Sequence, residues 1–345
     1  MGTTVCDLVL LSWNHLECTR PCVESILAHT QVPSHLIIVD QASEEETRSY
    51  LQSLQPSPFV RIEILWNPAN VGYPKGMNLG LAKGSAPYVC FLNNDILVPP
   101  GWLEEMLRVA ESDPTIGAVN PSSNTFNLNP PKGSDWMGFA KNRSKKKDRW
   151  IEVEYPEGFC LLGRREILLK VGGFDETTYE QIYFEDADLA RKLQTLGLKC
   201  VMAEGTYVWH AGGQTMSHRP ERLPLFQENE RRFFAKWGRV GRQIFYVVAD
   251  PSEALLMRVG EEARKEVNRF GKVWIFTNSH ALLKNLPRHL SIRISSFPRW
   301  QLPWMALGMA LLKKKKFEFI VTDLSVFRSI LKPLRFIHHA EVESL

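Results

Sequence analysis

Short apolar runs alternate with segments of helical periodicity along the first third of the chain. The apolar runs predict buried strands at 5–12, 35–40, 60–66, 88–92 and 116–119. Between them, apolar residues recur at the spacing of one helix face and predict helices at 19–30, 44–54, 75–83 and 100–113. Apolar strands that alternate with helices are typical of a mostly parallel sheet with helices on both faces. The fold class is therefore predicted to be α/β.

The alternation lapses in the middle of the chain. Residues 120–150 are rich in Asn, Pro, Ser, Lys and Gly and show no period, which predicts a long surface loop. Order resumes at 157–162, followed by a helix at 164–171 and another that begins at Glu185. Short strands at 199–202 and 207–210 and a helix at 224–240 complete this part.

A second alternation begins at Lys272. It predicts strands at 273–277, 290–295, 317–322 and 335–338 with helical segments between them. This pattern resembles half of another nucleotide-binding sheet. We therefore expect a main domain at 1–240, a linker or helical connection at 241–271, and a smaller, partly Rossmann-like α/β region at 272–345, as in a truncated second domain.

Composition narrows the function classes. The 345 residues carry a formal net charge of only +4, so no broad basic surface for nucleic acid is expected. The N-terminus lacks the basic start of a signal peptide, and no run of about 18 apolar residues is present to span a membrane. The six cysteines are scattered along the chain, a pattern that favours reduced thiols in the core over disulfides or a zinc site. These features predict a cytoplasmic protein.

Polar residues follow the predicted strands of the first part. In parallel α/β sheets, ligands bind beyond the carboxyl ends of the strands, so these residues are the candidates for binding. They are Ser12 and Asn14, then Asp40, then Asn70 and Gly72, then Asn93, Asn94 and Asp95. Asp40 could accept hydrogen bonds from a ribose or a base, or it could cap the following helix. We favour the ligand role because of its place at a strand end.

The segment 70–78 places glycines, amides and a cation beside a helix start. Gly72 would let the backbone approach a ligand closely, and Lys75 and Asn78 lie where a helix N-terminus favours anions. A turn that leads into a packed helix is the alternative. The chain has no Gly-x-Gly-x-x-Gly after its first strand and no Gly-Lys-Ser/Thr loop, which argues against a dinucleotide-binding fold and a P-loop nucleotidase.

Two positions are candidates for a metal site. Asp95 ends an apolar strand, and Mg²⁺ and Mn²⁺ prefer oxygen ligands supplied by one or two carboxylates and a substrate phosphate. The alternative for Asp95 is a turn residue. His210 also follows an apolar strand, where a neutral imidazole could ligate a metal, although a lone histidine is more often structural.

Glu185 and Asp186 begin a helix whose apolar face carries Leu189 and Leu193. Such carboxylates could supply a general base. The alternative is that they only complement the helix dipole, which favours acidic residues in a first turn.

Six blocks in this order resemble family 2 glycosyltransferases of the GT-A fold. The resemblance extends from about Val5 to Gly213 and is strongest to the bacterial branch with rhamnosyltransferases and other polysaccharide-building enzymes. The blocks are Leu11-Ser12-Trp13-Asn14, Ile38-Val39-Asp40-Gln41-Ala42-Ser43, Asn67-Pro68-Ala69-Asn70-Val71-Gly72, Phe91-Leu92-Asn93-Asn94-Asp95, Gly172-Gly173-Phe174-Asp175-Glu176 and Phe184-Glu185-Asp186-Ala187-Asp188-Leu189.

The resemblance implies an inverting hexosyl- or deoxyhexosyltransferase. The enzyme would move a sugar from a UDP- or dTDP-sugar to a hydroxyl of a saccharide or lipid-linked acceptor in surface polysaccharide synthesis. Asp40 would hold the nucleoside, Asp95 and His210 would hold Mn²⁺ or Mg²⁺, and Asp186 would be the general base with Glu185 beside it.

Two positions depart from the family pattern. Asn93 stands where the metal motif usually begins with Asp, so the site has one negative charge fewer. Gln41 replaces the usual Asn of the nucleoside block, which puts the base preference in doubt.

Two other function classes are weighed against the transferase. A nucleotidyltransferase would normally have a Gly-rich, basic loop after the first strand, which Ser12-Trp13-Asn14-His15 does not provide. A non-catalytic nucleotide-sugar-binding module would not need the combination of Asp95, Asp186 and His210.

The apolar segment 303–312 is followed by four lysines at 313–316. It could be an amphipathic helix that meets anionic lipid at the inner face of the membrane. We favour a buried helix of the C-terminal region with cations at its end.

Overall fold

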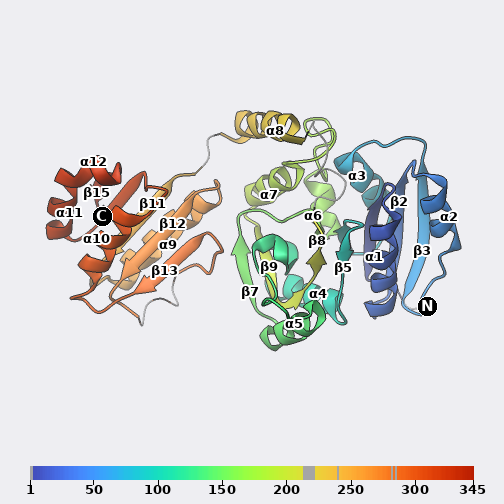
Figure 1. Cartoon of the computed structure of the whole chain (residues 1–345), viewed down its shortest axis with the longest axis horizontal. Helices are drawn as coiled ribbons and strands as arrows, with labels where there is room; N and C mark the ends of the chain where they lie inside the picture. The colour runs from blue at the N-terminus through green and yellow to red at the C-terminus, as the bar shows by residue number, and fades with distance from the viewer. Residues whose placement is uncertain (1–2, 213–221, 239–240, 281–282, 284–285) are drawn as a thin grey trace. The chain divides into compact units, whose positions relative to one another are not determined.

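The computed structural model describes residues 3–212, 222–238, 241–280, 283 and 286–345 (Figure 1). The chain divides into two compact units: Met1–Ile151 with Tyr155–Trp237, and Glu152–Glu154 with Gly238–Leu345. The domain boundary expected at 240, and Gly213 at the end of the family resemblance, lie outside the described residues.

The first unit is built on an eight-stranded sheet, in which most strands are parallel, as predicted. One strand, β8, is antiparallel to both of its neighbours, β4 and β6. In sheet order, the strands are β3 (Val60–Asn67), β2 (Ser34–Gln41), β1 (Cys6–Ser12), β4 (Tyr88–Leu92), β8 (Cys160–Arg164), β6 (Ile116–Ser122), β9 (Lys199–Tyr207) and β7 (Trp150–Val153).

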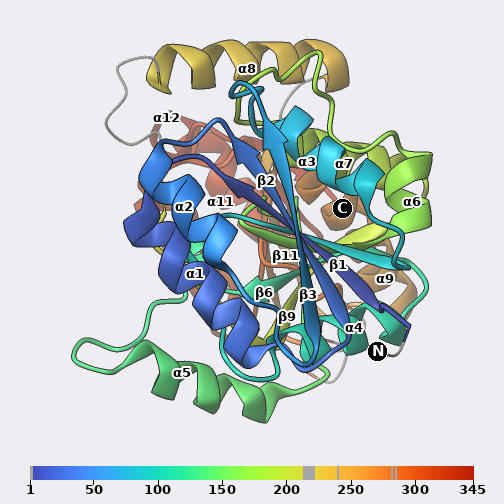
Figure 2. The ribbon, with the colours of Figure 1, turned by 90° about the vertical axis from the view of Figure 1, so that its right-hand side faces the viewer.

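Helices cover both faces of this sheet. Figure 2 shows α1 and α2 on one side of strands β1–β3 and α3 on the other. Helix α4 illustrates why they pack there, since its apolar residues Trp102, Leu103 and Met106 recur on one face and are fully buried. The helices are α1 (Leu16–His29), α2 (Glu45–Ser53), α3 (Tyr73–Lys83), α4 (Trp102–Ser112), α6 (Arg165–Lys170), α7 (Glu185–Thr195) and α8 (Arg222–Trp237).

The region predicted as a loop at 120–150 contains regular structure. Helix α5 (Trp136–Arg143) begins after Asp135, whose carboxylate accepts hydrogen bonds from the backbone N–H groups of Met137 and Gly138. Short 3₁₀ helices, Asn124–Phe126 and Ser144–Lys146, lie on either side. The prediction of a long loop was wrong here. The sequence of α5 has no apolar period, and only the Asp135 cap marks where the helix begins.

The strand predicted at 199–202 is longer than expected. It continues through the polar residues Glu204 and Thr206 to Tyr207. The backbone N–H of Glu204 donates to the carbonyl of Arg149, and this pairing keeps the segment extended. A separate short strand, β10 (Trp209–His210), then pairs antiparallel with β5 (Ile96–Leu97).

The second unit contains a separate, fully parallel five-stranded sheet, as expected for a small α/β region. Its central strand, β11, lies in the segment 241–271 that we expected to be a connection. An apolar run of six residues is too short for its period to distinguish a strand from a linker. In sheet order, the strands are β13 (Ile292–Ser296), β12 (Lys272–Thr277), β11 (Gln243–Val248), β14 (Phe319–Thr322) and β15 (Glu341–Ser344).

Alternate residues of β11 point to opposite faces of the second sheet. Ile244, Tyr246 and Val248 pack in one cluster with α9 (Glu253–Val267), whereas Phe245 and Val247 pack in the other with α10 (Leu302–Leu312) and α11 (Ser325–Leu331). The sheet therefore has α9 on one face and α10 and α11 on the other.

The strand predicted at 335–338 was wrong, because these residues form helix α12 (Arg335–His338). The side chain of His338 is fully buried, with Nε2 2.9 Å from the carbonyl oxygen of Leu331, and His339 ends the helix at φ 59°. Four residues are too few for a period to distinguish a helix from a strand.

Candidate active site

Ser12 and Asp40 lie side by side at the carboxyl ends of β1 and β2, since they are partners in the parallel register. Both residues are fully buried. Within the described part of the chain, Ser12 Oγ and Asp40 Oδ1 have no hydrogen-bond partner. Such orphaned oxygens are costly unless something else satisfies them, so they mark a place where a polar ligand would be stabilised.

The other oxygen of Asp40 is held by the protein. Oδ2 accepts a hydrogen bond of 3.2 Å from the backbone N–H of Ser43 and lies 3.7 Å from the Arg48 guanidinium. Arg48 in turn stacks 4.6 Å over the ring of Trp66. Because Asp40 has no exposed surface, a nucleoside would reach Oδ1 only after neighbouring side chains moved.

Asn14 connects the loops that follow β1 and β2. Its backbone N–H donates to Ser43 Oγ at 2.9 Å, and its Oδ1 accepts from the backbone N–H of Glu44 at 2.7 Å. Asn14 itself has a left-handed backbone, with φ 54°. These contacts assign Asn14 a structural role, and the predicted ligand contact stays a prediction.

Gln41, the departure from the family pattern, fixes the loop before α3. Its Oε1 accepts from the backbone N–H of Val71 at 2.8 Å, and its Nε2 donates to the Gly72 carbonyl at 3.2 Å. A Cβ on Gly72 would overlap the carbonyl oxygen of Glu180. Glycine is therefore required at position 72. Asn70 Oδ1 accepts a hydrogen bond of 2.9 Å from the backbone N–H of Gly72.

Lys75 and Asn78 differ in what they offer a ligand. Lys75 is exposed in the first turn of α3. Asn78 instead donates to the Phe174 carbonyl and to Glu176, and it accepts from the Phe174 N–H. Asn78 therefore ties α3 to the Gly-Gly-Phe-Asp-Glu block, and its predicted contact with a ligand is unsupported by these bonds.

Asp95 and His210 come together although they are 115 residues apart in sequence. The pairing of β10 with β5 places His210 opposite Ile96, so that His210 Nε2 lies 3.2 Å from Asp95 Oδ1. This oxygen is buried and has no hydrogen-bond partner among the described residues. Their side chains are only 8% exposed for Asp95 and 13% for His210.

The ring of His210 is held so that Nε2 faces the strand end. Nδ1 lies 2.9 Å from Thr125 Oγ1, and the ring stacks on Phe159 with centroids 4.9 Å apart. The amide Nδ2 of Asn93 lies 3.3 Å from Nε2. With a lone pair on Nε2 the ring can accept from the Asn93 amide or ligate a metal, whereas an N–H there would donate to Asp95 Oδ1.

Asn94 points elsewhere. Its amide donates to Thr19 Oγ1 in α1 at 2.8 Å. Its predicted contact with the donor stays a prediction.

The side chains at this strand end fit a hard divalent cation that is also bound by oxygen atoms of the substrate. The Asp95 carboxylate and Nε2 of a neutral His210 ring would supply two ligands of suitable chemistry. Among the described residues, no group of three or more His, Cys, Asp or Glu side chains could hold a metal. A cation would therefore depend on further ligands such as phosphate oxygens.

Glu185 and Asp186 begin α7 beside a third carboxyl group, that of Glu157, which the sequence analysis missed. Burial raises the pKa of Glu185 well above its usual value, and the neighbouring Asp186 and Glu157 raise it further. Burial raises the pKa of Asp186 to about 6, although the backbone N–H groups of Ala187 and Gly158 lower it in part. Burial and then Asp186 raise the pKa of Glu157 to about 8.

Burial and charge shift the pKa of the three carboxyl groups upward to different degrees. The pKa of Asp186, at about 6, lies below neutrality and below that of Glu157, at about 8. Asp186 Oδ1 accepts from the Ala187 N–H at 2.7 Å and Oδ2 from the Gly158 N–H at 3.2 Å. A single carboxylate is thus held in a fixed orientation and can take up a proton near neutral pH.

Consecutive residues connect the Asp186 carboxylate with His210. Gly158 donates to Asp186, and the next residue, Phe159, stacks on His210 and accepts from the Asn93 N–H at 2.9 Å. The side chain of Asn120 fixes the start of this segment, because it bonds both the N–H and the carbonyl of Glu157.

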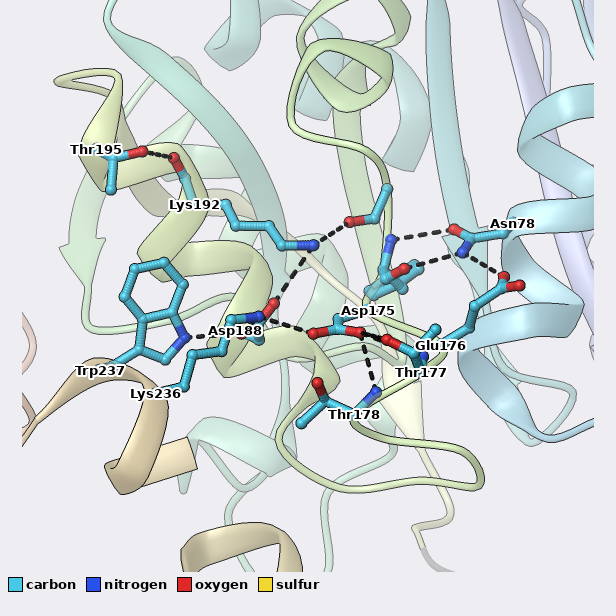
Figure 3. Close-up of polar contacts among 12 residues, drawn as sticks. Asn78, Asp175, Glu176, Thr177, Thr178, Asp188, Lys192, Thr195, Lys236 and Trp237 are labelled. Atoms are coloured by element: carbon cyan, nitrogen blue, oxygen red, sulfur yellow. Dashed lines mark hydrogen bonds and ion pairs between the residues drawn. The ribbon is translucent and has the colours of Figure 1, made fainter. Parts of the chain in front are cut away.

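A buried ion-pair network fixes the start of α7 (Figure 3). Asp188 is fully buried, 2.7 Å from Lys236 Nζ and 2.7 Å from Trp237 Nε1. Lys236 also reaches Asp175 at 2.7 Å, which holds the pKa of Asp175 well below its usual range despite burial. Helix α8 and the Gly-Gly-Phe-Asp-Glu block are thereby tied to the helix that carries Asp186.

Several of these supporting residues have a weak signal in the sequence. Asn120 follows the apolar run 116–119, so the strand-end rule that selected Asp40 could have selected it too. Glu157, Thr125 and Phe159 carry no such signal. Strand β8, which lies between β4 and β6, brings Glu157 and Phe159 to the site, whereas Thr125 lies in the short 3₁₀ helix after β6.

Comparison with known proteins agrees with this geometry. Residues 7–172 match the model of "Glycosyl transferase family 2". This part of the chain belongs to that family. A 253-residue match at 27% identity relates this chain to the N-acetylglucosaminyl-diphospho-decaprenol L-rhamnosyltransferase of Mycobacterium tuberculosis, covering 63% of this chain and 80% of that protein.

Other relatives are longer than this chain. The O-antigen biosynthesis protein RfbC of Myxococcus xanthus is 26% identical over 65% of this chain, but the match spans only 18% of that protein. Protein y4gI of Sinorhizobium fredii, which is uncharacterized, is 24% identical over 68% of this chain and 28% of its own length. The chain thus spans less than a third of these two relatives.

The fold is shared with a solved glycosyltransferase structure. The mannosyltransferase PcManGT of Pyrobaculum calidifontis, in complex with GDP-Man and Mn²⁺, superposes with a TM-score of 0.50 at 18% identity. The superposition covers 67% of this chain and 63% of that one. The likeness confirms the predicted GT-A fold of the first unit.

Proposed function

We propose that the chain is an inverting glycosyltransferase that moves a sugar from a nucleotide-diphosphate donor to a hydroxyl group. The observation that carries the proposal is the segment 158–159. It holds the Asp186 carboxylate through Gly158 and the His210 ring through Phe159, so that a base and a candidate donor-binding pair are fixed relative to one another.

Asp186 acts as the general base in this proposal. The acceptor hydroxyl gives its proton to the Asp186 carboxylate while its oxygen forms a bond to the anomeric carbon of the donor. The bond from that carbon to the diphosphate oxygen breaks, and its electron pair leaves with the nucleoside diphosphate. A single displacement of this kind inverts the anomeric configuration. Burial and the neighbouring Asp186 raise the pKa of Glu185 well above its usual value, which disfavours a second negative charge beside the base.

The donor side is assigned to the strand ends of β1, β2 and β4. Asp40 and Ser12 offer unpartnered oxygens for a nucleoside, and Lys75 at the start of α3 offers a charge for phosphate. Asn70, Gly72 and Asn93 border the same strand ends and stay candidates for donor contact. Asp95 and His210 would hold Mn²⁺ or Mg²⁺, which when bound would stabilise negative charge on the leaving diphosphate.

The relatives support a role in polysaccharide synthesis. A saccharide or lipid-linked acceptor in surface polysaccharide assembly accords with the printed names of the rhamnosyltransferase and the O-antigen protein. We propose a hexosyl or deoxyhexosyl group carried on UDP or dTDP, and a cytoplasmic site of action where such donors occur.

A donor panel tests this function. The full chain is incubated with UDP-, dTDP- and GDP-sugars and Mn²⁺, and the released nucleoside diphosphate is measured. We expect release from at least one donor, and we expect Asp95→Ala to abolish metal-dependent donor binding in titration calorimetry. Formation of a nucleoside triphosphate and a sugar 1-phosphate when pyrophosphate is added would instead indicate a nucleotidyltransferase. Binding of a donor without turnover in the presence of acceptors would indicate a non-catalytic module.

A further inference from the structure

Helix α10 of the second unit is apolar on the face that it exposes as well as on the face that it buries. Its eleven residues, Leu302–Leu312, include no charged side chain. Leu302, Ala306 and Ala310 recur every four residues and are fully buried against the second sheet. On the opposite side, Trp304 is 69% exposed and Leu312 is 83% exposed. The expectation of a buried helix was therefore right for only one of its faces.

The neighbouring helices extend this exposed apolar face. Helix α10 packs against both α11 and α12, as Figure 1 shows. Of the 17 exposed large hydrophobic residues among the described part of the chain, 8 lie between 300 and 337. We call this set the apolar surface; its members are Trp300, Trp304, Met305, Leu312, Val326, Ile330, Phe336 and Ile337.

The same stretch is strongly basic. Residues 299–339 contain eight Lys and Arg residues but only two acidic residues, Glu318 and Asp323. Lys314 and Lys315 directly follow α10 and are exposed. Lys313 stacks 4.3 Å over the Trp274 ring, and Lys316 donates to the carbonyl of Leu311, so the basic segment is held at the end of the helix.

We propose that the apolar surface, together with Lys314 and Lys315, docks on an anionic lipid bilayer. Exposed apolar side chains that gather on neighbouring helices mark interaction sites, because water does not stabilise them. Tryptophan and phenylalanine bordered by lysine and arginine are the side chains that insert at the headgroup level of anionic membranes. A nucleic acid would match the cations but would leave Trp304 and Phe336 in water.

The helix would lie in the plane of the membrane surface. None of the helices in the described part of the chain is long and apolar enough to cross a membrane. An eleven-residue helix with one face packed on the sheet can only present its other face to the lipid. The proposal involves none of the residues assigned to sugar transfer, so either can fail without the other.

Vesicle co-sedimentation of the full chain tests the proposal. Vesicles of phosphatidylcholine alone are compared with vesicles that also contain phosphatidylglycerol. We expect binding to the anionic vesicles, weakened by added salt. The double variant Trp304→Ser/Phe336→Ser and the double variant Lys314→Ala/Lys315→Ala should each weaken the apparent affinity by about tenfold or more.

The second unit supplies matched controls on the opposite face of its sheet. Met257 on α9 is 53% exposed and Met305 on α10 is 46% exposed, so Met305→Glu should weaken vesicle binding while Met257→Glu should not. Lys265→Ala on α9 is the control for the two lysines. Circular dichroism and thermal melting check that each variant folds.

Three outcomes would overturn the proposal. The first is no binding to anionic vesicles, and the second is equal binding by the α9 and α10 variants. The third is a change of molecular mass in light scattering on mutation of the apolar surface without loss of vesicle binding, which would assign this surface to a protein partner or a second copy.

Discussion

At the residue scale, the chemistry depends on which of three carboxyl groups is ionised. Besides burial, Asp186 raises the pKa of both Glu185 and Glu157, and Glu185 and Asp186 raise the pKa of the buried Tyr73. The pKa of Asp186 itself is about 6, below neutrality. It is also the carboxylate that accepts two backbone hydrogen bonds.

We expect the transfer rate to fall in acid with the titration of Asp186. A base must be ionised to accept a proton, so activity should be highest near neutral pH and decline as the pH drops through about 6. Below that point each pH unit should reduce kcat/KM about tenfold. A pH profile measured with a saturated donor checks this, and constant activity down to pH 4 would contradict it.

Glu157 should control the alkaline side of the same profile. Its pKa of about 8 means that a second negative charge forms near Asp186 in mild alkali, where it opposes an anionic donor. We expect activity to decline above pH 8 in the wild-type chain and not in Glu157→Gln. The acid limb should remain in this variant. An identical alkaline decline in both proteins would show that Glu157 is not its cause.

At the element scale, the turn before α3 is a close approach that only glycine permits. Gly72 has φ 85° and ψ 168°, a region that is nearly exclusive to glycine, and its missing Cβ makes room for the carbonyl of Glu180. We expect Gly72→Ala to lower the free energy of unfolding by about 3 kcal/mol or more.

Gly133 is a matched control for this substitution. It has the same φ of 85°, but an added Cβ there would contact nothing within 4 Å. Gly133→Ala should therefore cost only the backbone strain, about 1–2 kcal/mol. Urea unfolding measures both, and equal losses would show that the contact with Glu180 is unimportant.

The strand ends explain how much of the site could be predicted from sequence. Asp40 and Asp95 follow apolar runs, and a parallel sheet brings such ends to one edge, so the strand-end rule found them. His210 reaches Asp95 through the two-residue strands β5 and β10, which no period could reveal. Glu157 and Phe159 depend on an antiparallel strand inserted between β4 and β6, a long-range pairing that local patterns do not contain.

The same limit applies to the elements of the second unit. Strand β11 was taken for a connection because its apolar run is short, and α12 was taken for a strand because four residues contain no period. The other strands of this α/β region were predicted correctly where an apolar run marks them, at β12, β13 and β14.

At the scale of the whole molecule, the two proposals combine in one prediction. If the second unit docks on anionic lipid, it raises the local concentration of a lipid-linked acceptor around the enzyme. Trp304→Ser/Phe336→Ser should leave hydrolysis of the donor unchanged but slow transfer to an acceptor embedded in anionic vesicles. The two rates are measured in parallel. Equal slowing of both would contradict the separation of the two roles.

The central claim is that Asp186 is the base for sugar transfer, and Asp186→Asn tests it most directly. An amide of the same shape cannot accept the proton, so kcat for transfer should fall by about a hundredfold to ten-thousandfold while donor affinity, measured by calorimetry, stays within about twofold. Asp148→Asn, at a side chain that is 59% exposed, is the matched control and should transfer normally. Near-normal transfer by Asp186→Asn at saturating donor would contradict the account.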